Sequence, residues 1–258
     1  MNRIQDYVEL KKRIVSWIKD YADSNGIKSL VVGVSGGIDS AVVSTLCAET
    51  GLPTYVLTMP LNSKKENTAL SDAHAKALDD KYENVSHHNV DLSTTYHKLL
   101  STIGLQTSPE GFTHNRDFMS NELANANTKS RLRMVTLYQI SGAVGGIVVG
   151  TGNKVEDYGV GFYTKYGDGG VDIAPIADLY KTEVRELGSY LRVSADIIDA
   201  KPTDGLWDDG RSDEDQIGAT YAELEEAMEN GTGKAVDILS RFNRQNRHKM
   251  EPIPTFKL

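Results

Sequence analysis

Cysteine is almost absent from this sequence, which has one, Cys47, among 258 residues. A single cysteine excludes an intrachain disulfide and is most simply a small core residue, so we expect a cytoplasmic protein. No run of residues is long and apolar enough to span a membrane, and the first residues lack the apolar core of a signal peptide. Positive charge is also in deficit, since the formal net charge is −8. Nucleic-acid partners need a basic face, so we expect neither nucleic acid nor membrane as a partner.

The glycine-rich turn near the N-terminus matches neither G-x-x-x-x-G-K-[ST] nor G-x-G-x-x-G, the motifs of two common nucleotide sites. Residues 30–34 are apolar and mostly β-branched, which predicts a strand buried on both faces. Residues 35–37 follow as a tight turn, and Asp39 and Ser40 open a predicted helix that ends at Gly51. Glycines let backbone N–H groups approach a phosphate, and a helix N-terminus favours its charge. This stretch therefore predicts an anion site, with a plain turn as the alternative.

Strand-like and helix-like segments alternate along the chain. The expected strands are 30–34, 53–59, 84–90 and 147–149. The expected helices are 3–24, 39–50, 65–80, 92–103, 118–144, 178–191, 220–229 and 234–247, and Asp178 is the expected N-cap of the helix at 178–191. Loops are expected at 104–115, 152–175 and 202–212. This order predicts an α/β fold: one domain over residues 1–258 with a doubly wound, mainly parallel sheet and helices on both faces. Ligands of such sheets bind beyond the carboxyl ends of the strands, so loops 35–39, 60–65 and 151–157 should share one rim.

A second informative block is residues 150–184, whose centre reads FYTKYGDGG. Together with SGGIDS at 35–40, this block is similar to the ammonia-dependent NAD synthetases, which belong to the N-type ATP pyrophosphatases. Shorter matches support the resemblance: NTKSRLR at 127–133, PTDGL at 202–206, SDE at 212–214 and HK at 248–249. Each piece alone is weak, but their joint order and spacing are specific and cover nearly the whole chain.

The resemblance implies an adenine nucleotide alpha hydrolase-like, Rossmann-like fold and a known reaction. That family converts nicotinic acid adenine dinucleotide (deamido-NAD) into NAD with ATP, magnesium and ammonia. A carboxylate does not react with ammonia directly, so ATP first adenylates it and releases pyrophosphate, and ammonia then displaces AMP. The resemblance also implies a homodimer. No glutaminase domain is expected, so free ammonia is the implied nitrogen source.

The resemblance further assigns roles to named residues. ATP contacts fall on Gly33, Val34, Ser35, Gly36, Gly37, Ile38, Asp39, Ser40, Thr151, Lys181 and Thr203. Deamido-NAD contacts fall on Arg131, Lys165, Asp172, His248 and Lys249. Asp39 and Glu156 hold magnesium, a hard ion that prefers oxygen ligands. Asp168 is our hypothesis for the catalytic acid that holds the ammonium and eases loss of its proton, because it is an unpaired acid in a loop expected near the reacting carboxyl.

Several of these residues also have a simpler interpretation. Asp39 is a suitable N-cap, and Glu156 alone would be a solvated loop acid. Lys181 is expected in the first turn of a helix, where a cation is unfavourable unless an anion lies nearby, although a solvated lysine is the alternative. Arg241, Arg244, Arg247 and His248 recur at helical spacing, and a solvated face is the default for such a stripe. The aromatic residues around Lys165 can pin their loop to the core.

Two other function classes remain open. The nearer one is another ATP pyrophosphatase, such as a tRNA-thiolating or GMP-forming ligase, although a tRNA enzyme ordinarily has a basic surface and catalytic cysteines. The other is a non-catalytic adenine-nucleotide-binding regulatory protein, which would have no use for Glu156, Lys165 and Lys181 together. Within the family, a preference for nicotinate mononucleotide over the dinucleotide is also open.

Overall fold

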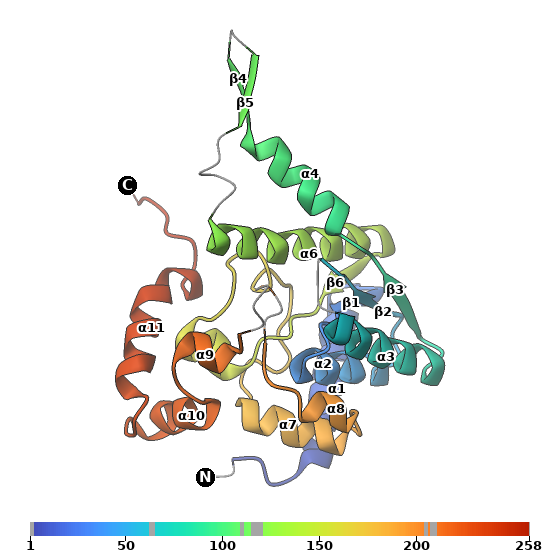
Figure 1. The fold of residues 1–258 in the computed structure, drawn as a ribbon. Helices are drawn as coiled ribbons and strands as arrows, with labels where there is room; N and C mark the ends of the chain where they lie inside the picture. Colours follow the sequence, from blue (N-terminus) through green and yellow to red (C-terminus); the bar gives the residue numbers. More distant parts are fainter. Residues whose placement is uncertain are drawn as a thin grey trace.

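The computed structural model describes residues 3–61, 65–108, 111–114, 121–203, 206 and 211–257. Its centre is a four-stranded sheet in the order β3-β2-β1-β6 (Figure 1). The strands are β1 (Ser29–Gly33), β2 (Thr54–Thr58), β3 (Val85–Asn89) and β6 (Gly146–Val148). Every neighbouring pair is parallel, and Val31 of β1 stands opposite Tyr55 of β2 and Val148 of β6. The predicted α/β fold with a parallel sheet is confirmed.

Helices cover both faces of this sheet, as a doubly wound fold requires. The α-helices that the structure describes are α1 (Tyr7–Ser24), α2 (Ile38–Glu49), α3 (Lys65–Lys81), α4 (Ser93–Gly104), α6 (Glu122–Val144), α7 (Lys181–Tyr190), α8 (Ala195–Ile198), α9 (Asp213–Ile217), α10 (Tyr221–Asn230) and α11 (Val236–Met250). Alternate residues of β1 point to opposite faces. Leu30 and Val32 join a core with α1, α2, α3 and α7, whereas Val31 joins a core with α4 and α6. Cys47 is buried in the first of these cores, as predicted.

A third core lies beside the sheet, where the chain returns after β6. It joins a six-residue π-helix, η1 (Val155–Val160), to α9, α10 and α11, and Tyr221 and Leu224 are buried in it. Sequence periodicity did not predict η1, because six residues make little more than a single turn of a π-helix and cannot show a repeat. Helices α8 and α9 are also too short to be recognised from periodicity. Among the described residues, no helix has both the length and the apolar character to cross a bilayer.

Two local predictions are wrong. Part of the expected loop at 104–115 forms an antiparallel hairpin, β4 (Leu105–Ser108) with β5 (Gly111–His114), that stands away from the body in Figure 1. Each strand has four residues, too few for an alternating pattern to be recognised. The second error concerns the start of α7, whose N-cap is Tyr180 and not Asp178. The carboxylate of Asp178 instead accepts a hydrogen bond from Lys154 at 2.7 Å.

Candidate active site

The turn after β1 is held by its own serines. The backbone N–H of Ser35 donates to Ser40 Oγ at 3.1 Å, and Ser40 Oγ donates to the carbonyl of Gly37 at 3.0 Å. Gly36 has a φ of 89°, a conformation that favours glycine. Gly37 is the N-cap of α2, so Asp39 lies within the first turn of the helix and is not its N-cap. The turn thus presents a helix N-terminus with Asp39 beside it.

A pocket opens at this edge of the sheet. It is lined by all the residues predicted to contact ATP, from Gly33–Ser40 through Thr151 and Lys181 to Thr203, and also by Glu156 and Asp168. The predicted rim is therefore confirmed for the loops after β1 and β6. The loop after β2 contributes Met59 and Pro60, and residues 62–64 of its expected range lie outside the described residues.

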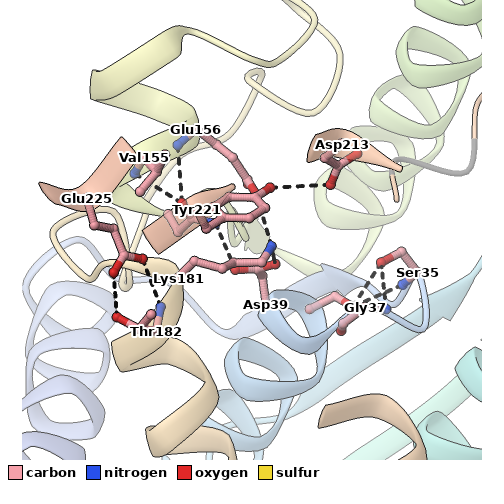
Figure 2. Close-up of polar contacts among 12 residues, drawn as sticks. Ser35, Gly37, Asp39, Val155, Glu156, Lys181, Thr182, Asp213, Tyr221 and Glu225 are labelled. Carbon is pink, nitrogen blue, oxygen red and sulfur yellow. Dashed lines mark hydrogen bonds and ion pairs between the residues drawn. The ribbon is translucent and has the colours of Figure 1, made fainter. Parts of the chain in front are cut away.

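The ammonium group of Lys181 is the centre of the polar network in Figure 2. Its Nζ lies 2.5 Å from Asp39 Oδ2 and 3.0 Å from Glu156 Oε1, and its side chain is 3% exposed. Burial alone would lower the pKa of Lys181, but Asp39 and Glu156 outweigh this effect and hold the pKa above its ordinary value. The cation at the start of α7 therefore has the anionic neighbours that its position requires, and the solvated alternative is wrong.

Two residues that the sequence analysis missed hold these carboxylates in place. Asn153 donates from Nδ2 to Asp39 Oδ1 at 3.0 Å, and its Oδ1 accepts the backbone N–H of Glu156 at 3.2 Å. The hydroxyl of Tyr221 donates to Glu156 Oε1 at 2.6 Å and lies 3.3 Å from Asp213 Oδ2. Asn153 precedes η1 as Asn often precedes a helix, which was a usable sequence signal. No local signal links Tyr221 to Glu156.

Helix α7 is fixed at the residue next to Lys181. Glu225 of α10 accepts the backbone N–H of Thr182 at 3.0 Å and its hydroxyl at 2.6 Å (Figure 2). Glu183 accepts the backbone N–H of Tyr180 at 2.8 Å. The first turn of α7 is thus held by carboxylates, as favoured at a helix N-terminus.

A further acid, Asp157, also lines the pocket and was missed. Its carboxylate lies against Gly152, where a Cβ would stand 2.3 Å from Oδ1. Burial, followed by the charge of Glu156, raises the pKa of Asp157 to about 7.

Asp168 lies at the pocket, but the expectation that it is unpaired is wrong. Its Oδ1 accepts hydrogen bonds from Ser130 Oγ at 2.7 Å and from the backbone N–H of Thr164 at 3.0 Å. In return, the backbone N–H of Asp168 donates to Ser130 Oγ at 2.9 Å. These contacts hold the residue 164–168 loop against α6.

A second group of cations lies where the end of α11 meets this loop. Lys165 Nζ donates to the carbonyl of His248 at 2.9 Å, and Lys249 Nζ donates to the carbonyl of Tyr163 at 2.7 Å. Arg131 donates from Nε and Nη2 to the carbonyl of Lys165 at 3.3 and 3.2 Å. Four of the residues predicted to contact deamido-NAD are therefore brought together here, outside the lining of the pocket.

Asp172, the fifth residue predicted to contact deamido-NAD, lies apart from this group. Its Oδ1 accepts the hydroxyl of Tyr138 at 3.0 Å, and its Oδ2 accepts the backbone N–H of Val148 at 2.7 Å. Arg241, Arg244 and Arg247 are exposed on α11, in agreement with the solvated interpretation of that stripe.

The carboxylates of Asp39 and Glu156 fit a magnesium ion. Among the described residues, no three His, Cys, Asp or Glu side chains could hold a metal together. Magnesium does not need such a cage, because it is commonly bound by one or two carboxylates and by the phosphates of a substrate. Asp39 and Glu156 already converge on one cation, the ammonium of Lys181, beside a helix N-terminus suited to phosphate.

Comparisons with known proteins show which family the chain resembles over nearly its whole length. The family model described as NAD synthase matches residues 10–253. The NH(3)-dependent NAD(+) synthetase of Finegoldia magna is 35% identical, over 98% of this chain and 97% of that protein. That of Alkaliphilus metalliredigens is 37% identical, over 94% of this chain and 96% of that protein. A solved structure of NMN synthetase from Francisella tularensis superposes with a TM-score of 0.85 at 31% identity, over 99% of this chain and 100% of that one.

Proposed function

The chain belongs to the NAD synthase family, and we propose that it catalyses the ATP-dependent amidation of deamido-NAD by ammonia, giving NAD, AMP and pyrophosphate. The observation that carries the proposal is the convergence of Asp39, Glu156 and Lys181 at the N-terminus of α2. A merely nucleotide-binding protein needs the glycine turn but not this buried set of charges.

In the first step, a carboxylate oxygen of deamido-NAD attacks the α-phosphorus of ATP, and pyrophosphate leaves with the electron pair of the broken bond. A helix N-terminus stabilises a nearby charge by about 0.3–1 kcal/mol, and by at most about 2 when partly buried. That is too little to bring a carboxylate against a triphosphate. We propose that Lys181 supplies positive charge to the phosphates, with the residue 33–40 turn, Thr151 and Thr203 as further ATP contacts. Magnesium held by Asp39 and Glu156 would neutralise more of the phosphate charge.

In the second step, ammonia attacks the acyl adenylate and AMP leaves. Ammonium must first lose a proton, because its nitrogen has no free electron pair. We propose Asp168 as the group that holds the ammonium, with its hydrogen bonds to Ser130 and Thr164 keeping it in position. The reaction needs no covalent enzyme intermediate, so catalysis rests on positioning and charge.

The cation group at the end of α11 is proposed to bind the substrate. Arg131, Lys165 and Lys249 donate to backbone carbonyls, and the carbonyl that accepts from Lys165 belongs to His248. Cations in this setting suit the negative charges of a nucleotide. For Asp172, contact with deamido-NAD remains a prediction from the family resemblance alone.

We also propose a cytoplasmic homodimer in which the chain acts as a single domain on free ammonia. The presence of a single cysteine, Cys47, supports the cytoplasmic location. Leu123 and Val135 of α6 are 60% and 57% exposed, which supports this helix as the face that meets a second copy.

An NMN-forming variant of the same reaction is the second candidate function. It is favoured by the likeness to the NMN synthetase from Francisella tularensis, with its TM-score of 0.85. In that case the acceptor would be nicotinate mononucleotide, and the chemistry at the carboxyl would be unchanged.

The test is to incubate purified protein with ATP, magnesium and ammonium, together with either deamido-NAD or nicotinate mononucleotide, and to separate all nucleotides by chromatography. NAD formed in equal amounts with AMP and pyrophosphate is the expected result. NMN formed from the mononucleotide at a higher kcat/KM would favour the second candidate. Intact ATP with both acceptors would overturn the proposal and leave a binding protein. Lys181→Met should lose most of this activity, because it removes the positive charge proposed to act on the phosphates. Lys154→Met, which removes a lysine that pairs with Asp178, is its matched control.

A further inference from the structure

Lys181 occupies the one position on which the Asp39 and Glu156 carboxylates converge. Its Nζ lies 2.5 Å from one carboxylate and 3.0 Å from the other. The proposed function assigns the same two carboxylates to a divalent metal ion, and the present inference rests on that assignment. We propose that Lys181 and the metal ion compete for these carboxylates, so that the metal enters this site only together with the phosphates of the nucleotide.

Charge and burial make the two cations mutually exclusive. Asp39 and Glu156 share one ammonium group, so a divalent ion added beside it would place two cations against the same two carboxylates. The side chain of Lys181 is 3% exposed, and the ring of Tyr221 lies 4.8 Å from its Nζ. Water therefore screens the repulsion between neighbouring cations only weakly. A metal ion alone would have to displace an ammonium that already neutralises one of its ligands.

Nucleotide phosphate removes this obstacle. Lys181 is the first residue of α7 and lines the same pocket as the residue 33–40 turn. A phosphate bound at that turn gives the ammonium a new anionic partner within the pocket, and the lysine side chain is long and flexible enough to turn toward it. Both carboxylates are then free for the metal ion. Before that, the lysine is the cation that balances two partly buried carboxylates, whose side chains are 14% and 16% exposed.

The first measurement follows metal binding without nucleotide, acceptor or turnover. Mn²⁺ is titrated into the protein at pH 8, and free Mn²⁺ is followed by electron paramagnetic resonance. The variants are Lys181→Met, Lys181→Arg and the surface control Lys154→Met, each checked for native thermal unfolding. We expect Lys181→Met to bind Mn²⁺ at least about tenfold more tightly than wild type, equivalent to about 1.4 kcal/mol. Lys181→Arg keeps the charge and should bind as weakly as wild type, as should Lys154→Met.

Two results would overturn the competition. One is a Lys181→Met variant that folds and binds Mn²⁺ no more tightly than wild type. The other needs no variant: wild-type protein that binds Mn²⁺ as tightly without nucleotide as with a non-hydrolysable ATP analogue. Either result would leave the amidation reaction untouched, because no acceptor is present. Conversely, failure to form NAD would not alter a tenfold gain in Mn²⁺ affinity on loss of the lysine.

Discussion

Tyr221→Phe removes one hydroxyl from the centre of the site and keeps the ring. That hydroxyl is buried and donates to Glu156 Oε1 at 2.6 Å. Burial, followed by the charge of Glu156, raises the pKa of Tyr221 above its ordinary value, so the hydroxyl remains protonated and serves as a donor. The ring also lies 4.8 Å from Lys181 Nζ, a contact that phenylalanine retains.

The expected loss is about 2 kcal/mol in the free energy of unfolding. A hydrogen bond to a charged group contributes about 1.5–3 kcal/mol, and here the acceptor cannot recover its partner from bulk water. For a chain of this size, about 2 kcal/mol corresponds to a fall of roughly 4–8 °C in Tm. Because Glu156 also loses a group that orients it, KM for ATP should rise in the same variant.

Tyr138→Phe is the matched control. It removes the same group from a tyrosine–aspartate pair, the 3.0 Å contact to Asp172, where the carboxylate is exposed. Water replaces the lost donor there, so we expect a change below about 1 kcal/mol. Thermal unfolding and urea titration measure both variants side by side. Equal changes in Tm for Tyr221→Phe and Tyr138→Phe would refute the claim that the site holds Glu156 through the buried hydroxyl.

Three further predictions use other parts of the structure. Burial lowers the pKa of His74 from 6.5 to about 4, so the folded state keeps the neutral ring. The free energy of unfolding should therefore fall by about 3 kcal/mol as pH drops from 6.5 to 4. Urea titrations of His74→Gln should show a correspondingly weaker pH dependence. Gly152→Ala places a Cβ 2.3 Å from Asp157 Oδ1 and should lower the free energy of unfolding by about 1–3 kcal/mol. Gly142→Ala, with open space around its Cβ, should be neutral or stabilising by up to about 1 kcal/mol. Equal Tm values for the two variants would contradict the predicted clash at Gly152. Asp168→Asn should lower kcat about 10²-fold and alter its pH profile at constant free ammonia, and an unchanged profile would remove Asp168 from the mechanism.

Where sequence predicted the fold well, each local pattern agreed with the tertiary arrangement. The apolar residues of β1 are buried on both faces because helices cover both sides of a parallel sheet, so a short β-branched run was enough to identify the strand. The start of α7 was predicted wrongly because Asp178 is of a residue type that is favoured at an N-cap. Glu183 caps the backbone at Tyr180 instead, and Asp178 bonds to Lys154.

In the candidate site, too, local patterns were predicted well and contacts between distant segments were missed. The residues predicted to contact ATP came from one contiguous motif and from the family resemblance, and residues 33–40, Thr151, Lys181 and Thr203 all line one pocket. Tyr221 was missed because its role depends on α10 packing against η1, which no local pattern encodes. Asp168 was wrongly taken as unpaired because Ser130, its partner, lies 38 residues away on α6.

Transfer of oxygen from the acceptor to AMP tests the central claim most directly. Deamido-NAD labelled with ¹⁸O in its carboxylate is converted in the presence of ATP, magnesium and ammonium, and AMP and pyrophosphate are analysed by mass spectrometry. Because the carboxylate oxygen bonds to the α-phosphorus and departs with AMP, we predict one ¹⁸O atom in each AMP and none in pyrophosphate. AMP without ¹⁸O, formed alongside NAD, would contradict an acyl adenylate and the arrangement of charges proposed to produce it.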